Sequence, residues 1–316
     1  MDFKFAEKQN STEEKDTEEI KVVFSGSYED TPENREITIE EGIEEIAENA
    51  FRDFEYLECV HLPKSMKIIS VAAFAGCKRL SRIDMNFGLV EIQDEAFSSC
   101  PSLTSVIIPD TVKRIGEGAF EGCASLSSVK LSESVYMIGA GAFAYCFNLT
   151  DVTIPDSCVL VEFNAFASCF SLEAIKLSEN MALLDESLFE GCRSLRTVDM
   201  PGKLTRIGRR VFKGCTSLSS VILPVSVSAI GFDAFAGCTS LQRIAIPKAM
   251  RELEDLDVFS DCDALSDISY GGSREEWELL CRGDSLTVVR TDGSVYTPTV
   301  TFLNLKDKKT EQTYEI

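Results

Sequence analysis

Residues that could carry catalysis are few in this chain. It has one histidine, His61, with no evident serine or cysteine partner, whereas a hydrolytic triad needs a nucleophile beside a base. A carboxylate pair is the remaining option. Asp151 and Asp199 fall two repeats apart on the strands described below, roughly 12 Å, which is wider than a glycosidase pair. No glycine-rich phosphate-binding loop follows a strand. We therefore expect no catalytic residue and no cofactor.

Twelve cysteines offer a second kind of chemistry, and nine of them recur at one repeat position. These nine are Cys77, Cys100, Cys123, Cys146, Cys169, Cys192, Cys215, Cys238 and Cys262. A free thiol behaves as a small buried hydrophobe, so we expect a thiol ladder in the core, with disulfides disfavoured because the Cβ vectors of neighbouring turns run parallel. Zinc sites use C-x₂-C pairs, which the chain lacks, so no metal site is expected. Cys158 falls at a core position, and Cys59 and Cys281 are the thiols to test for reactivity.

A regular repeat must position these side chains. Phenylalanines recur every 23 residues at Phe74, Phe97, Phe120, Phe143, Phe166, Phe189, Phe212 and Phe235, while Phe51 precedes the series by 23 and Phe259 follows it by 24. Each unit reads V-x-x-I-x-x-x-A-F-x-x-C-x-x-L-x-x-V-x-I-P in outline. A fixed period of about 20 to 50 residues is typical of a solenoid.

The pattern inside a unit predicts its local structure. Leu103, Val106 and Ile108 show the period-two alternation of a short strand whose Val and Ile face inward, and Pro109 ends it. The apolar pair that follows predicts a second brief strand, and A-F-x-x-C is long enough for one helical or 3₁₀ turn. We predict a right-handed leucine-rich-repeat-like stack with a parallel β-sheet on one face and short 3₁₀ or helical turns opposite.

The repeat resembles the BspA-like leucine-rich repeat family, in which units of this length end in a similar Gly-Cys step. Ala119-Phe120-Glu121-Gly122-Cys123 carries the match, which extends over about residues 43–282. Members of that family are mostly found on or outside bacterial and protozoan cells and are implicated in adhesion to host proteins and other microbes. The resemblance therefore implies a binding role.

The rest of the chain is divided around this array. We expect an acidic disordered segment at 1–19, an N-terminal cap at 20–42, a solenoid of about ten units at 43–272, a C-terminal cap of a helix plus strands at 273–304, and a charged tail at 305–316. Ser273 and Glu276 form the S-x-x-E capping box of the cap helix, and Trp277 is expected to pack on the last turn. Because both ends are capped, we expect a monomer.

Charge and hydropathy restrict the partners and the compartment. The net charge of −21 disfavours nucleic acid, and no apolar stretch of about 18 residues predicts membrane insertion. As written, the chain has no secretion signal. We expect it in the cytoplasm if it is complete, and on the cell surface or secreted if a leader was removed.

Two outward positions per repeat flank the inward Val and form the exposed side of the strand sheet. In chain order they are Cys59/His61, Arg82/Asp84, Ser105/Ile107, Ser128/Lys130, Asp151/Thr153, Ala174/Lys176, Thr197/Asp199, Ser220/Ile222, Arg243/Ala245 and Asp267/Ser269. Their mixed charge suits a protein-facing surface, and repeat proteins usually recognise partners through such a face. We predict binding residues among Arg82, Asp84, Ile107, Lys130, Asp151, Lys176, Asp199, Ile222 and Arg243.

These patterns favour a non-enzymatic scaffold that recognises a protein or glycan partner, for adhesion or cell-surface interaction. A structural spacer without a ligand is the principal alternative, and a carbohydrate-active enzyme is a distant one. Arg282, Gly283 and Asp284 also spell the tripeptide that integrins read, although a helix C-cap already accounts for Gly283.

Overall fold

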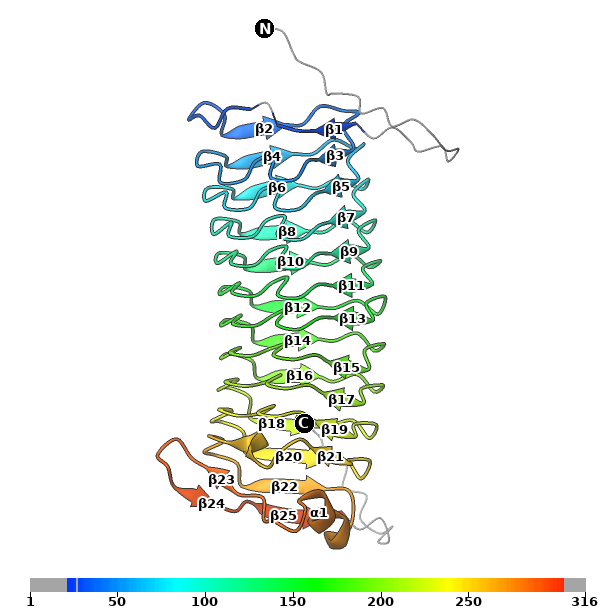
Figure 1. The fold of residues 1–316 in the computed structure, drawn as a ribbon, viewed down its shortest axis with the longest axis vertical. Coiled ribbons are helices and arrows are strands. Elements are labelled where there is room, and N and C mark those ends of the chain that lie inside the picture. The colour runs from blue at the N-terminus through cyan, green and yellow to red at the C-terminus, as the bar shows by residue number, and fades with distance from the viewer. Residues whose placement is uncertain (1–21, 27, 304–316) are drawn as a thin grey trace.

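The chain winds into one elongated solenoid in which every turn repeats the same three walls (Figure 1). The computed structural model describes residues 22–26 and 28–303. The expected acidic segment at 1–19 and the charged tail at 305–316 lie outside the described residues. The winding of the described residues confirms the predicted parallel-strand solenoid as the fold.

The first wall is built from the longer strands. These are β2 (Glu36–Thr38), β4 (Cys59–His61), β6 (Arg82–Asp84), β8 (Ser105–Ile107), β10 (Ser128–Lys130), β12 (Asp151–Thr153), β14 (Ala174–Lys176), β16 (Thr197–Asp199), β18 (Ser220–Ile222), β20 (Arg243–Ile246), β22 (Asp267–Tyr270) and β25 (Thr299–Phe302). Neighbours within each hydrogen-bonded group run parallel, and Val106 of β8 lies opposite Val129 of β10. Because the register equals the repeat period, inward residues meet inward residues along the stack.

The second wall follows after a corner and consists of two-residue strands. These are β1 (Val23–Phe24), β3 (Glu45–Ile46), β5 (Ile68–Ile69), β7 (Glu91–Ile92), β9 (Arg114–Ile115), β11 (Met137–Ile138), β13 (Leu160–Val161), β15 (Leu183–Leu184), β17 (Arg206–Ile207), β19 (Ala229–Ile230) and β21 (Glu252–Leu253). They also pair in parallel, as Ile92 does with Ile115. Their second residue is buried in every turn from β3 onward, so this wall closes the core on a second side.

The third wall is made of hydrogen-bonded turns, where the sequence predicts a helical turn. Ala72 and Gly76 have φ of 51° and 76°, a left-handed conformation that a helix cannot propagate through. The N–H of Phe74 donates to the Ala96 carbonyl of the next turn at 2.8 Å. Every second N–H of this wall therefore bonds to the next turn, while the alternate ones close single i→i−3 turns, as the N–H of Ala75 does with the Ala72 carbonyl at 3.1 Å. Within the described residues one continuous 3₁₀ helix, η1 (Asp257–Phe259), interrupts this alternation.

That helix coincides with a change in repeat length. Phe235 and Phe259 are 24 residues apart instead of 23, and the hydrogen bonds between turns place the extra residue between Glu254 and Val258, where η1 begins. The aromatic rings of Phe235 and Phe259 nevertheless lie 5.7 Å apart, within the range of the other pairs. The added residue is thus accommodated in the turn wall without displacing the interior.

Ten phenylalanines form a continuous column inside the stack, as the repeat predicts. Each is buried with no measurable exposure, and adjacent ring centroids are 4.9 to 6.1 Å apart with nearly parallel planes. Phe24 extends the column by one ring, 5.3 Å from Phe51. Offset-stacked rings at this spacing are an attractive arrangement that also removes a large apolar area from water.

The nine repeat cysteines form the expected buried ladder, and the structure gives them a further role. Each thiol donates to the carbonyl of the phenylalanine 26 or 27 residues earlier, at sulfur-to-oxygen distances of 3.0 to 3.3 Å. Cys146, for example, bonds to the Phe120 carbonyl. All twelve cysteines of the chain are free thiols. A buried carbonyl is costly without partners, so cysteine supplies both apolar volume and a donor.

The C-terminal end is closed by a helix and three strands. Helix α1 (Arg274–Leu280) begins with the predicted capping box between Ser273 and Glu276, and Trp277 packs against Tyr270 with ring centroids 5.2 Å apart. The segment that follows α1 contains the strands predicted for this cap, in two different pairings. Strands β23 (Val288–Val289) and β24 (Val295–Tyr296) form an antiparallel pair, and β25 adds to β22 in parallel.

We predict that Phe143→Ala lowers the free energy of unfolding by about 3–5 kcal/mol, because it removes a ring held between two others. Phe87→Ala is the matched control, since that ring is 79% exposed and should change stability by less than about 0.5 kcal/mol. Urea unfolding of both variants measures the difference. A loss below about 1 kcal/mol for Phe143→Ala would contradict the column as the centre of the core.

Candidate functional site

The outward side of the longer strands is an ordered, flat surface, which we call the long-strand face. In β8, β10, β12, β14 and β18 the two outer residues are exposed and the middle residue is buried. Ile107 and Ile222 are 68% and 70% exposed. Among the predicted binding residues, Asp84 is half-buried and the other eight are exposed. Their part in binding stays a prediction.

Charges on the long-strand face are mostly available to a partner. Arg82 binds Asp84 on its own strand through two hydrogen bonds of 2.8 and 2.9 Å. Lys130, Lys176 and Asp199 have no ion pair within residues 28–303. A charge that is solvated and unpaired can form an ion pair with a partner without first breaking one in the protein.

The N-terminal end of this face holds a polar cluster centred on the single histidine. The Nε2 atom of His61 lies 2.7 Å from a carboxylate oxygen of Glu36, and its Nδ1 atom lies 2.9 Å from one of Asp84. The Cys59 sulfur is 3.6 Å from Nε2. Both ring nitrogens therefore have acidic partners, which leaves neither free to act as a general base.

The cluster perturbs the titration of its members. The hydrogen bond that His61 donates to Glu36, followed by its interactions with Asp84, raises the pKa of His61 despite its partial burial. The Arg82 guanidinium holds the pKa of Asp84 below its usual value. Partial burial, with help from Asp84 and Glu36, raises the pKa of the Cys59 thiol. The carboxylates of Glu36 and Asp84 thus shift His61 toward its protonated form, and burial together with these carboxylates shifts Cys59 toward the thiol.

Sequence reasoning missed this cluster, because Glu36 lies in the segment predicted to be a cap. A signal was nevertheless present. Cys59 and His61 are two residues apart on a strand and so point to the same side, and Glu36 and Asp84 lie one turn before and one turn after them.

The loop after α1 contains the predicted adhesion tripeptide. Arg282, Gly283 and Asp284 are exposed, and Arg282 and Gly283 have φ of 58° and 85°. The N–H of Gly283 donates to the Glu278 carbonyl at 2.9 Å. This loop therefore ends the helix, as predicted for a glycine at the helix C-cap. Adhesion through it stays a prediction.

An aromatic cluster at the corner before the long strands was also not anticipated. Phe147 and Phe170, from adjacent turns, stack with centroids 4.8 Å apart, and the Arg193 guanidinium lies 4.5 Å above the Phe170 ring. Tyr145 is 6.3 Å from Phe147 and is 48% exposed. The sequence signal was an aromatic residue beside the repeat cysteine in two successive units.

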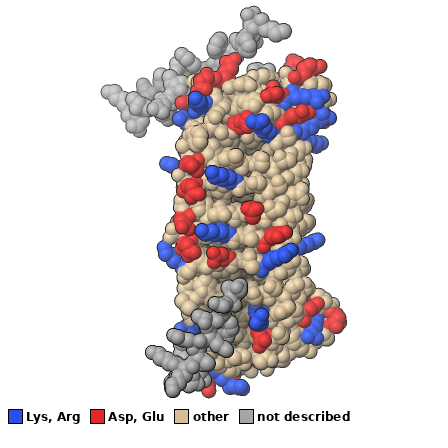
Figure 2. All heavy atoms as spheres, turned by 180° about the vertical axis from the view of Figure 1, so that it is seen from behind, with Lys and Arg blue, Asp and Glu red and all other residues tan. Residues whose placement is uncertain are grey.

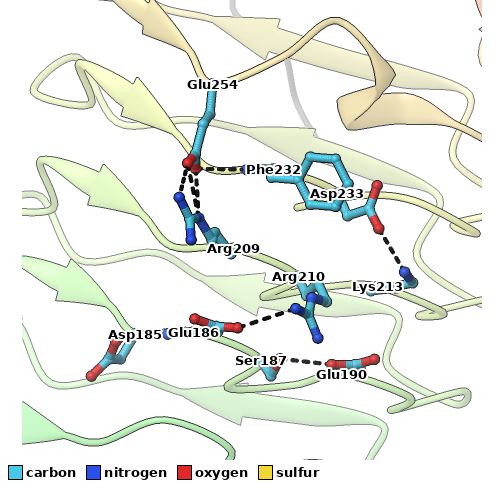
Figure 3. A network of polar contacts seen from close by, with 10 residues as sticks. All are labelled: Asp185, Glu186, Ser187, Glu190, Arg209, Arg210, Lys213, Phe232, Asp233 and Glu254. Carbon is cyan, nitrogen blue, oxygen red and sulfur yellow. Dashed lines mark hydrogen bonds and ion pairs between the residues drawn. The ribbon is translucent and has the colours of Figure 1, made fainter.

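On the back of the solenoid, acidic and basic side chains are interspersed along the turns (Figure 2). Figure 3 shows a network of polar contacts in the turn wall that joins adjacent turns and, through Arg209 and Glu254, turns two apart. Arg209 binds Glu254, which also accepts the N–H of Phe232 at 3.1 Å. Lys213 binds Asp233 at 2.6 Å. Arg209, followed by the Phe232 N–H, lowers the pKa of Glu254 to about 2. These contacts connect successive turns of the solenoid.

No helix in the part of the chain that the structure describes is long and apolar enough to cross a bilayer.

Comparison with known proteins connects the repeat to a family. The model of a BspA type leucine rich repeat region matches six copies, over residues 21–146, 90–219 and 183–278. A leucine-rich repeat protein from Bacteroides ovatus is 26% identical, with 85% of this chain and 83% of that chain covered and a TM-score of 0.46. A leucine rich cell surface protein from Faecalibacterium prausnitzii is 25% identical, with 80% and 91% covered and a TM-score of 0.43.

A leucine rich repeat protein of T. pallidum is 29% identical, with 58% of this chain and 78% of that chain covered and a TM-score of 0.45. The search of curated proteins gave no match.

We predict that Cys59 is the first thiol of the native, metal-free protein to react with a disulfide reagent, because it alone is not buried. The other eleven are buried, and burial raises the pKa of Cys281 to about 11 and that of Cys146 to about 12. Thiol titration with a chelator present should therefore count one fast group before denaturation and twelve after it. Cys59→Ser should remove the fast group, and several fast thiols would contradict a closed ladder.

We predict a small loss of stability for Glu254→Gln that depends on pH. The pKa of Glu254 is lowered on folding, so its contribution is present above the unfolded value of about 4.5 and disappears as the pH falls toward about 2. Thermal melts at pH 7 should separate the variant from the wild-type protein, and melts near pH 2 should not. Glu252→Gln, at an exposed position, is the control. A difference that grows on acidification would be inconsistent with the Arg209 pairing.

Proposed function

Because this chain belongs to the BspA-type leucine-rich repeat family, we propose that it is a non-enzymatic scaffold that recognises a protein partner through its long-strand face. A glycan partner is the alternative within the same class. The observation that carries the proposal is the regular display of unpaired charges and exposed isoleucines on that face.

The backbone beneath this face supports recognition by being held in place. The middle residue of each strand is anchored in the core, as Val152 and Ile175 are, with 3% exposure each. Strands such as β14 are hydrogen-bonded on both sides. A surface that is ordered before binding loses little conformational entropy when a partner docks.

The composition of the face favours a protein partner. Ile107 and Ile222 supply apolar contact area on β8 and β18, and Lys130, Asp151 and Lys176 place charges of both signs on the strands between them. Apolar contacts bordered by polar groups are the usual composition of a protein interface. The strongly negative chain, at −21, disfavours nucleic acid as the partner.

Two other functions are less well supported. A spacer without a ligand needs no regular surface display, although it tolerates one. A carbohydrate-active enzyme would need two carboxyl groups close enough to flank one bond, whereas Asp151 and Asp199 lie on β12 and β16, two turns apart. We propose that adhesion or cell-surface interaction is the setting of the binding activity, because the family implies it.

The proposal is tested with a variant that disrupts the face without touching the core. Ile107→Asp, Lys130→Glu and Lys176→Glu together place acidic groups at exposed positions of three strands. We expect the wild-type chain to capture a protein from extracellular-matrix or cytosolic extracts, and the triple variant to lose at least about tenfold in affinity for it, because like charges and a lost apolar contact each weaken docking.

The matched control carries the same three kinds of change elsewhere, as Val225→Asp, Lys78→Glu and Lys113→Glu, all at exposed positions. It should bind like the wild-type chain. If both variants bind the partner equally well, the binding site is not the long-strand face, and the aromatic cluster and the Arg282 loop become the candidates. Failure to capture any partner would favour the spacer.

A further inference from the structure

Three metal-ligand side chains meet at the N-terminal end of the long-strand face, on β2 and β4. Glu36 pairs in register with Cys59 of the next turn, and His61 follows Cys59 by two residues on the same side of β4. One donor atom from each of the three lies within 4.8 Å of the other two. The parallel register thus assembles a thiol, an imidazole and a carboxylate from segments 25 residues apart.

The spacing of these donors matches one metal in particular. Zinc–sulfur and zinc–nitrogen bonds of about 2.3 and 2.0 Å at a tetrahedral angle place sulfur and nitrogen roughly 3.5 Å apart. The Cys59 sulfur and the His61 Nε2 atom are 3.6 Å apart. The Glu36 oxygen is closer to Nε2, at 2.7 Å, but its side chain is 69% exposed and can withdraw by the few tenths of an ångström that coordination requires.

The histidine is also oriented as metal-binding histidines are. Its Nδ1 atom is 2.9 Å from an Asp84 carboxylate oxygen, which directs Nε2 toward Cys59 and Glu36. A carboxylate behind a ligating imidazole fixes its tautomer and raises its basicity. Arg82 in turn holds Asp84 through two hydrogen bonds, so this supporting carboxylate is itself fixed.

From this geometry we propose that Glu36, Cys59 and His61 bind a zinc ion, with Asp84 as the positioning residue behind His61. A thiolate, an imidazole and a carboxylate are a zinc-type donor set, whereas calcium and magnesium select oxygen ligands. Zinc replaces the thiol proton of Cys59 and the proton that His61 shares with Glu36. The site is independent of the proposed binding function, because it requires no protein partner.

Charge and access are compatible with an ion here. With a thiolate, two carboxylates, a neutral imidazole and the Arg82 guanidinium, the cluster carries −3 + 1 = −2, which one zinc ion neutralises. The His61 side chain is 31% exposed, so the ion can enter from solvent. Three protein ligands leave the fourth tetrahedral position for water or another small ligand.

The test is a zinc titration of the untagged, reduced full-length chain by calorimetry. We expect saturable binding of one ion per chain, no comparable binding of calcium or magnesium, and protection of Cys59 from alkylation by zinc. Cys59→Ser and His61→Gln should each weaken zinc binding by at least about 100-fold, and Asp84→Asn by about 10-fold. Glu33→Gln, an exposed carboxylate outside the cluster, should leave the affinity unchanged.

Cobalt(II) provides a readout that does not depend on affinity alone, since a bound thiolate gives a sulfur-to-cobalt charge-transfer band. That band should be present in the wild-type chain and absent in Cys59→Ser, with circular dichroism showing that the variant is folded. Lack of saturable zinc binding in the wild-type chain would overturn the proposal. Binding that survives in both Cys59→Ser and His61→Gln would overturn it as well.

Discussion

The requirement that each turn hydrogen-bond to the next determines the rest of this structure. Parallel pairing on two walls and N–H bonds between turns on the third align every residue with its equivalent one turn away. A side chain in the interior therefore touches its equivalents one turn above and below, which in the phenylalanine and cysteine columns are the same residue type. Only residue types that pack well against their own kind suit such a position, which accounts for the phenylalanine column and for the cysteine beside it that donates to a phenylalanine carbonyl.

The same constraint shapes the surface. Because register places outward residues in columns, neighbours on the long-strand face come from positions about one period apart, as Lys130 and Ile107 do. Interior columns hold apolar residues, of one type or of several as in Val135, Cys158 and Met181, whereas outward positions vary more widely in charge and polarity. The distinctive chemistry of the chain, including the Glu36, Cys59 and His61 cluster, is consequently found where the columns are irregular.

Much of this arrangement was accessible from the sequence, because the repeat specifies which residues share an environment. The strand walls, the core columns, the exposure of Arg243 and the capping box at Ser273 all followed from spacing. The left-handed positions of the turn wall did not follow from spacing, because they are occupied by glycine in some turns but by Tyr145 and Arg210 in others. The residue type at these positions therefore does not reveal the backbone conformation. The histidine cluster was missed because it depends on the pairing of Glu36 with Cys59. Glu36 lies in the N-terminal cap, where the sequence no longer follows the repeat pattern.

The longer repeat that ends at Phe259 shows where the architecture accommodates growth. Its extra residue lies between Glu254 and Val258, where η1 begins, while the thiol of Cys262 still reaches the Phe235 carbonyl at 3.1 Å. Interior alignment and loop length are therefore separable in this protein. Insertions at this corner can lengthen the chain locally and diversify one edge of the molecule, while duplication of whole units lengthens the rod, so evolution can vary the two independently.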